Sequence, residues 1–170
     1  MTFGAPWGRD VKWITWLVVA VLTVVAVVMV VVERQALEEK EAKIGAYAGV
    51  GGVLLVLLVV SAFAPRGYRV TAGYVEVLRP IGTVRIPLVE VTEVRRIEKK
   101  ELSAMRLAGS GGFFGYYGAY RNRALGSFRM YVTDLSRAVL LRGKKSVVVS
   151  PDRPDVFVEV VRSYQSISTG

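Results

Sequence analysis

The order of apolar and polar positions divides the chain into three parts. Two long apolar runs come first: residues 13–32 hold 20 positions without a charged side chain, and residues 44–64 hold 21. Short runs in which apolar and polar positions alternate follow, up to residue 150. Residues 154–164 then place their apolar side chains at helical spacing. The pattern predicts two apolar helices, a mainly β region and one C-terminal helix.

Each apolar run is long enough to cross a membrane. About 20 residues at a rise of 1.5 Å span a hydrocarbon core of about 30 Å. A core helix of a soluble domain would show a polar face, and the first run is longer than the apolar region of a usual signal peptide. The connector, residues 33–43, consists of strong helix formers and forces the two helices to be antiparallel. We therefore expect residues 1–65 to form an N-terminal flank and a transmembrane hairpin.

The basic residues that flank the spans predict which side of the membrane carries the termini. Cytoplasmic flanks are enriched in Lys and Arg. Five basic residues flank the side of the termini and three lie in the connector: Arg9, Lys12, Arg66, Arg69 and Arg79 against Arg34, Lys40 and Lys43. Residues 66–170 also carry 18 basic and 9 acidic side chains. We expect a multi-pass protein of the cell membrane with both termini in the cytoplasm.

The second apolar run contains small residues at helical spacing. Gly45 and Gly49 are four residues apart, and so are Ala48 and Gly52. Such a face lets two helices approach closely in lipid. It can serve packing within the hairpin or contact between copies of the chain, and the sequence leaves both open.

The alternating region predicts seven short strands. Two lie in residues 68–80, two in 82–100, one in 126–134 and two in 137–150, each bounded by turn-forming residues. Residues 150–166 then begin with helix-opening Ser, Pro and Asp and continue with an apolar stripe. The sequence therefore predicts a mainly β domain that ends in one amphipathic helix.

Three segments of this domain carry a resemblance to a known family. They are residues 83–94, 112–134 and 147–161, the last with Ser150 and the spaced residues Pro151, Pro154 and Phe157. Together they resemble the pleckstrin-homology-like (PH-like) domains of bacteria that are attached to membrane helices. The resemblance covers residues 66–167 and leaves a tail of residues 168–170. It implies a seven-stranded barrel capped by a C-terminal helix, and a membrane-tethered module without known catalysis that often assembles with itself.

The segment 109–126, GSGGFFGYYGAYRNRALG, has glycine at every third position from 109 to 118. Three glycines inside a helix would cost about 3 kcal/mol, so we expect a tight loop. Its aromatic and basic side chains are candidate contacts, and three uses stay open: the barrel itself, lipid headgroups, or another subunit. The candidate contact residues are Phe113, Phe114, Tyr116, Tyr117, Arg121 and Arg123.

Other functions lack their sequence signals. A phosphate loop needs Gly-Lys-Ser/Thr, and a dinucleotide loop would need glycine where Phe114 stands. The chain has no Cys or His, so we expect no catalytic residue, metal site or cofactor. The turns Ala72-Gly73 and Pro80-Ile81-Gly82 lack the lysines with which PH domains hold phosphoinositides. We also expect no nucleic-acid partner and identify no small-molecule substrate.

These observations predict a non-catalytic interaction or scaffold module that is anchored in the lipid bilayer and associates with itself or with another membrane protein. The alternative is a module at the membrane surface that binds anionic lipid headgroups nonspecifically. A net charge of +9 suits either function near an anionic leaflet.

Overall fold

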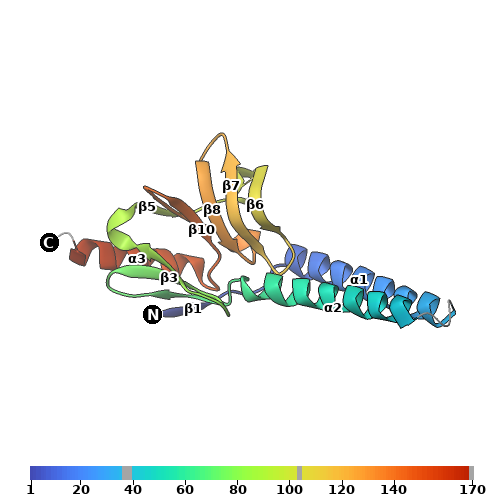
Figure 1. Cartoon of the computed structure of the whole chain (residues 1–170). Helices are drawn as coiled ribbons and strands as arrows, with labels where there is room; N and C mark the ends of the chain where they lie inside the picture. The colour runs from blue at the N-terminus through green and yellow to red at the C-terminus, as the bar shows by residue number, and fades with distance from the viewer. Residues whose placement is uncertain (36–39, 103–104, 169–170) are drawn as a thin grey trace.

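Two long helices project from one side of a mainly β domain, and the domain contains both the first strand and the last helix of the chain (Figure 1). The helices are α1 (Arg9–Gln35) and α2 (Lys40–Ala62). The computed structural model describes residues 1–35, 40–102 and 105–168, and the side chains of residues 1–32, 47–102 and 107–166.

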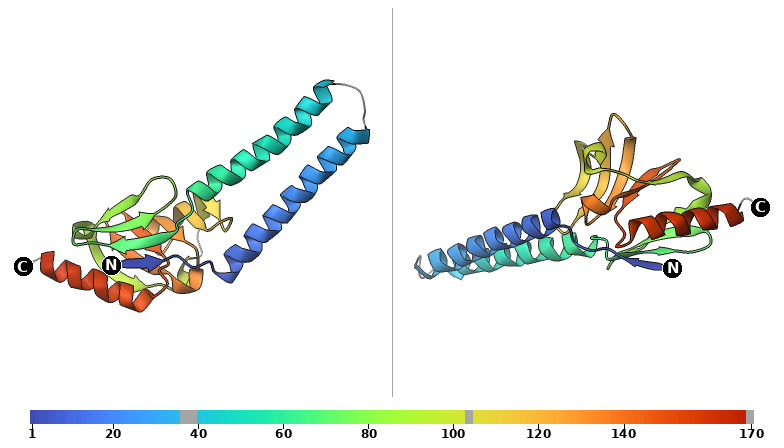
Figure 2. Two further views of the ribbon diagram at one scale, coloured as in Figure 1. Left: turned by 90° about the horizontal axis from the view of Figure 1, so that it is seen from below. Right: turned by 180° about the vertical axis from the view of Figure 1, so that it is seen from behind.

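The two helices lie beside each other (Figure 2). Most of their apolar side chains in the described residues are exposed. Trp13 and Trp16 are 77% and 70% exposed, and Leu58 of α2 is 66% exposed. Within Arg9–Val32, the most apolar stretch of 18 residues is only 6% buried. By length and composition, this is the one helix in the described residues that could cross a membrane; the apolar stretch of α2, Tyr47–Ala62, is shorter.

The strands form two separate sheets. The first has the order β1-β2-β3-β4, and the second has the order β5-β9-β10-β8-β7-β6, in which only β10 and β8 are parallel. The strands are β1 (Thr2–Gly4), β2 (Gly67–Val70), β3 (Tyr74–Leu78), β4 (Val84–Pro87), β5 (Val91–Arg96), β6 (Met105–Gly111), β7 (Tyr116–Asn122), β8 (Gly126–Val132), β9 (Val139–Gly143) and β10 (Ser146–Val149). Among the described residues, three short 3-10 helices and the C-terminal helix complete the domain: η1 (Leu88–Glu90), η2 (Lys99–Leu102), η3 (Leu135–Arg137) and α3 (Pro154–Ser168).

The mainly β domain and its C-terminal helix are confirmed, whereas the closed seven-stranded barrel is wrong. The seven predicted strands are β2 to β5 and β8 to β10, but the described residues contain ten strands in two open sheets. Pro87 and the turn η1 carry the chain from one sheet to the other, so β4 pairs with β3 and β5 pairs with β9. Alternation reports which face of a strand is buried, and it does not report which edges meet.

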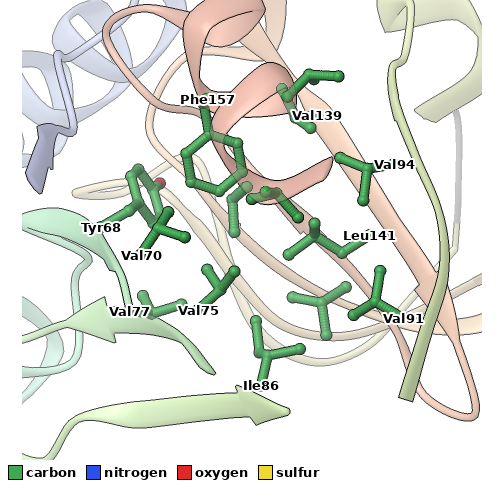
Figure 3. Close-up of a cluster of buried hydrophobic side chains, with 14 of the residues drawn as sticks. Tyr68, Val70, Val75, Val77, Ile86, Val91, Val94, Val139, Leu141 and Phe157 are labelled. Carbon is green, nitrogen blue, oxygen red and sulfur yellow. The ribbon is translucent and has the colours of Figure 1, made fainter. Parts of the chain in front are cut away.

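The main core lies between the two sheets and α3 (Figure 3). One face of the first sheet meets one face of β9, and Phe157 of α3 fills the space between them. The packing follows the period of two in the strands and the helical stripe of α3. The fully buried members include Tyr68, Val70, Val75, Val77, Val139, Leu141, Val149, Phe157 and Val161.

The residues that precede α1 belong to this core. β1 pairs with β2 in antiparallel register, and the amino group of Met1 donates a hydrogen bond of 2.7 Å to the carbonyl of Val70. Phe3 is 1% exposed, and its ring centroid lies 5.1 Å from that of Phe157. Residues 2–4, which the sequence places in a flank of the membrane hairpin, are therefore a strand of the β domain, and α1 begins from a fixed point.

A buried tyrosine links the two sheets. The hydroxyl of Tyr68 donates to the carbonyl of Tyr131 at 2.6 Å and accepts from the amide of Ser150 at 3.1 Å. The hydroxyl of Ser150 in turn accepts from the amide of Thr133 at 2.8 Å. Burial raises the pKa of Tyr68 to about 12, although the hydrogen bonds from Ser150 act in the opposite direction. The phenol is therefore held in its neutral form.

Replacing Phe3 by Ala should destabilise the full chain by about 3–5 kcal/mol, because it removes a fully buried ring and leaves a cavity beside Phe157. The check is denaturant unfolding of the protein in detergent micelles. Tyr74→Ala is the matched control, because Tyr74 is 45% exposed and its loss should change stability little. Equal unfolding midpoints for Phe3→Ala and the control would show that β1 does not support the core.

The pKa of Tyr68 predicts a loss of stability at high pH. The unfolded phenol ionises near pH 10 and the folded one near pH 12, so the contribution is complete below pH 10 and disappears as the pH rises to about 12. Tyr68→Phe lacks this titration. The stability advantage of the wild type over Tyr68→Phe, measured by denaturant unfolding at pH 9 and pH 12, should therefore shrink. An advantage that is constant between the two pH values would contradict the assignment.

Candidate functional site

The glycine and aromatic segment forms a β-hairpin at the base of the two helices. β6 and β7 pair from Met105↔Arg121 to Gly111↔Tyr116, and the turn closes with a 3.1 Å hydrogen bond from the amide of Gly112 to the carbonyl of Gly115. The expected tight loop is thus limited to the turn, and two strands occupy the rest. We call β6, β7 and this turn the junction hairpin.

Two of its glycines allow the strands to approach closely. Gly109 and Gly118 face each other across the hairpin, with φ angles of +114° and +122°. A Cβ atom on Gly109 would lie 2.0 Å from the carbonyl oxygen of Tyr117, and one on Gly118 would lie 2.2 Å from that of Ala108. Only glycine fits both the backbone angle and the space. The three-residue spacing of the glycines therefore reflects backbone geometry in a hairpin.

The turn of the junction hairpin contacts α1. The amide of Phe114 donates a 3.0 Å hydrogen bond to the hydroxyl of Thr15, a residue of α1 that is 5% exposed. The ring of Phe114 lies 4.5 Å from that of Phe113 and 5.7 Å from that of Trp7, centroid to centroid. Phe114 has a φ angle of +56°, which costs free energy in a residue with a side chain. Its hydrogen bond and ring contacts to α1 and the preceding segment stabilise this conformation.

The first residues of β7 contact α2. The hydroxyl of Tyr117 donates a 2.6 Å hydrogen bond to the carbonyl of Val60. The amide of Ile81, from the loop between β3 and β4, donates to the carbonyl of Ala62 at 3.1 Å. The last carbonyls of a helix find no donor within the helix, so partners from outside must satisfy them. The β domain therefore caps α2, and burial raises the pKa of Tyr117.

Charged groups complete the junction at the start of α1. The ammonium group of Lys99 lies 2.6 Å from a carboxylate oxygen of Asp10, which raises the pKa of Lys99. Tyr116 lies beside this pair, and its pKa is raised first by burial and then by the charge of Asp10. Both members of the ion pair are at least half exposed, so the pair adds orientation more than stability.

A cavity of about 380 Å³ lies where the junction hairpin meets the two helices. Its wall combines Ile14 of α1 with Val59, Val60 and Phe63 around the end of α2. The hairpin contributes Gly109, Ser110, Gly111, Phe113 and Tyr117. Most of these groups are apolar, and the arrangement offers shape and hydrophobic surface for binding.

The structure brings four of the six candidate contact residues to this junction: Phe113, Phe114, Tyr116 and Tyr117. Arg121 and Arg123 are exposed and lie at the other end of β7 and in the turn to β8. This end of the strand pair β7 and β8 points away from the two helices (Figure 1). Tyr117 and Arg121 are four residues apart on a strand, which separates them by roughly 13 Å. The aromatic and basic residues therefore do not form one site.

The glycines of α2 have different surroundings. A Cβ atom on Gly49 would lie 3.6 Å from the side chain of Met29 in α1, so this glycine faces the neighbouring helix. At Gly52, no atom lies within 4 Å of such a Cβ among the described residues. Gly45 belongs to the part of α2 whose side chains lie outside the described residues.

The sequence does not single out several residues of the junction. Thr15 and Val60 lie inside apolar runs, where lipid solvation accounts for them equally well, and Ile81 lies in the predicted turn Pro80-Ile81-Gly82. A polar residue near the start of an apolar run is the signal that Thr15 offers. In the described residues, no group of three acidic, His or Cys side chains could hold a metal ion.

Gly109→Ala should disrupt the junction hairpin, because its Cβ atom would overlap the backbone of Tyr117 and its φ angle is unfavourable. We expect a loss of about 3 kcal/mol or more in the free energy of unfolding of the full chain in detergent. Gly73→Ala is the control, since its φ is not in the left-handed region and a Cβ there meets no atom within 4 Å. Equal stability of the two variants would refute the close approach of β6 and β7.

Comparison with known proteins identifies the domain that carries this junction. No curated protein and no solved structure matches the chain. The model of the bacterial PH domain family matches residues 66–165, which include β2 to β10 and most of α3. This match covers more than half of the 170 residues. The chain therefore belongs to the bacterial PH domain family.

Proposed function

We propose that the chain is a membrane-anchored interaction module without catalytic activity, which associates with itself. In this proposal α1 and α2 form a transmembrane hairpin in the cell membrane, and the PH-like domain lies in the cytoplasm with both termini. One observation supports the anchoring. Only 6% of the most apolar 18-residue stretch of α1 is buried, although the chain just before α1 is bound to the β domain by a hydrogen bond from Gly8 to Thr133.

A core helix and a signal sequence are two alternative roles for α1, and both fit the structure poorly. A core helix of a soluble protein would bury its apolar side chains, whereas those of α1 are exposed. A signal sequence is removed after export together with the residues before it. Removal would take away β1 and Phe3, which is 1% exposed, and open the main core. The packing of Phe3 therefore favours a helix that is retained.

The second helix supports a hairpin. Residues 44–62 of α2 carry no charged side chain and rise by about 28 Å, close to the hydrocarbon thickness of about 30 Å, although the apolar stretch of α2 is shorter than that of α1. Leu55 and Leu58 are more than 60% exposed, and Gly49 faces Met29 of α1. Because α1 leaves the domain and α2 returns to it, a bilayer around both helices would place the domain on one side.

The sheet edge supports self-association. β6 is the last strand of the six-stranded sheet and pairs only with β7 among the described strands. Leu107 on this strand is 52% exposed. An open edge with an exposed apolar side chain can pair with the same edge of a second copy. The family supports an interaction or scaffold role for the domain.

The runner-up, binding of anionic lipid headgroups, is supported by the charges at the helix bases. Arg9, Lys12, Arg66 and Arg79 flank the ends of α1 and α2, and none has a carboxylate within 4.0 Å among the described residues. Elsewhere on the domain Arg95 is paired with Glu101, whereas Arg123 and Lys144 also have no carboxylate within 4.0 Å among the described residues. Near an anionic leaflet each basic residue adds about 1 kcal/mol of attraction.

Two measurements on the full chain test the proposal. The protein should stay in the membrane fraction after extraction at pH 11, because only lipid solvates its helices. In detergent its mass should exceed that of one chain, and Leu107→Glu should lower it by placing a charge on the β6 edge.

Val89→Glu is the matched control, because Val89 is 88% exposed but lies in η1, away from β6. Release of the wild-type chain at pH 11 would contradict the anchoring. A mass of a single chain, or equal masses for both variants, would contradict association through β6.

A further inference from the structure

The loop between β3 and β4 lies against the end of α2. The amide of Ile81 donates to the carbonyl of Ala62, and the side chain of Ile81 is 58% exposed. Phe63, the next residue after α2, is 40% exposed. Two apolar side chains are thus presented where α2 meets the β domain. At this point a membrane helix would leave the hydrocarbon core and meet the headgroups.

Arg79 is held at this corner without a counter-charge. Its Nε–H donates a 2.9 Å hydrogen bond to the carbonyl of Gly82, and its guanidinium carbon lies 5.6 Å from the ring centroid of Phe63 and 5.9 Å from that of Tyr131. No carboxylate lies within 4.0 Å of it among the described residues, and no hydrogen bond of its Nη atoms is found there. A positioned guanidinium with free donors can bind a phosphate with two hydrogen bonds.

Phe63 joins this corner to apolar space. It lines the cavity of about 380 Å³ under the junction hairpin, and an apolar groove of about 500 Å³ runs further along between α1 and α2. The groove is lined by side chains on one face of each helix, between Val19 and Val31 in α1 and between Val50 and Leu57 in α2. Both spaces are lined mostly by apolar side chains, so a flexible hydrocarbon chain can enter them.

We propose that a phospholipid molecule binds at this junction. Its phosphate is bound by Arg79, and one acyl chain lies beside Phe63 in the cavity and continues between the helices. The inference rests on the membrane anchoring proposed above and assigns a specific residue to the contact with lipid. The choice of a lipid follows from the combination of an unpaired cation and an adjoining apolar cavity, because a phospholipid carries both complementary groups.

The test measures lipid bound to the delipidated full chain in detergent. Titration with 1-palmitoyl-2-oleoyl-phosphatidylglycerol, followed by native mass spectrometry, should show one tightly bound lipid per chain. Arg79→Gln should weaken this binding by about tenfold, because it removes a charge-assisted contact to the phosphate. Arg123→Gln makes the same change in net charge on an exposed arginine far from the helices, and it should bind as the wild type does.

A second variant tests the acyl chain. Val59 lines the cavity and is 48% exposed, so Val59→Trp should fill the space while the protein still folds. Bound lipid should fall although Arg79 is unchanged. Unfolding midpoints of all variants close to that of the wild type keep a loss of lipid separate from a loss of structure.

The outcomes separate the lipid site from the anchoring. Equal lipid binding by Arg79→Gln and Arg123→Gln, or normal binding by Val59→Trp, would overturn the site while the chain stays resistant to extraction at pH 11. A complex that contains two chains and no bound lipid would show that a second copy of the chain occupies the groove. This result would also overturn the lipid site. Release of the wild-type chain at pH 11 would instead overturn the anchoring, and the lipid site with it.

Discussion

The placement of the two long helices on the β domain depends on one β-hairpin that is hydrogen-bonded to both of them. The amide of Phe114 binds the hydroxyl of Thr15 in α1, and the hydroxyl of Tyr117 binds the carbonyl of Val60 in α2. These two donors come from residues three apart in the same hairpin, so one short segment connects both helices to the β domain. Gly109 and Gly118 make the hairpin possible, because a side chain at either position would overlap the opposite strand.

The other contacts at the bases of the helices also hold the helices against the β domain. β1 holds the chain before α1 in the first sheet, with Phe3 in the core, and the amide of Ile81 caps the carbonyl of Ala62 at the end of α2. The junction is thus fixed by separate hydrogen bonds from both sheets. A domain held in this way would keep one orientation to a bilayer around the helices, which suits a module that presents a surface to partners or to lipid headgroups.

The sequence predicted the elements whose periodicity is long enough to read: the two apolar helices, seven strands and α3. It missed β1 because Thr2–Gly4 is too short to show alternation, and it missed β6 and β7 because glycines hide the alternation there. The prediction of a closed barrel is wrong because the pairing of sheet edges depends on residues far apart in the sequence. The contacts of the site are also long-range, because nothing near Tyr117 in the sequence indicates that its hydroxyl bonds to Val60. Arg121 is only four residues from Tyr117 in the sequence, but it lies at the other end of the strand.

The most direct measurement of the central claim is the chemical accessibility of single cysteines in native membranes, since the chain has no cysteine of its own. Val24 lies in the middle of α1 and is 61% exposed, and Arg123 is exposed on the β domain. A membrane-impermeant maleimide should label Arg123→Cys in inverted vesicles and label Val24→Cys only after the protein is denatured in sodium dodecyl sulfate and urea. Labelling of Val24→Cys in intact vesicles at the rate of Arg123→Cys would contradict a lipid-embedded hairpin.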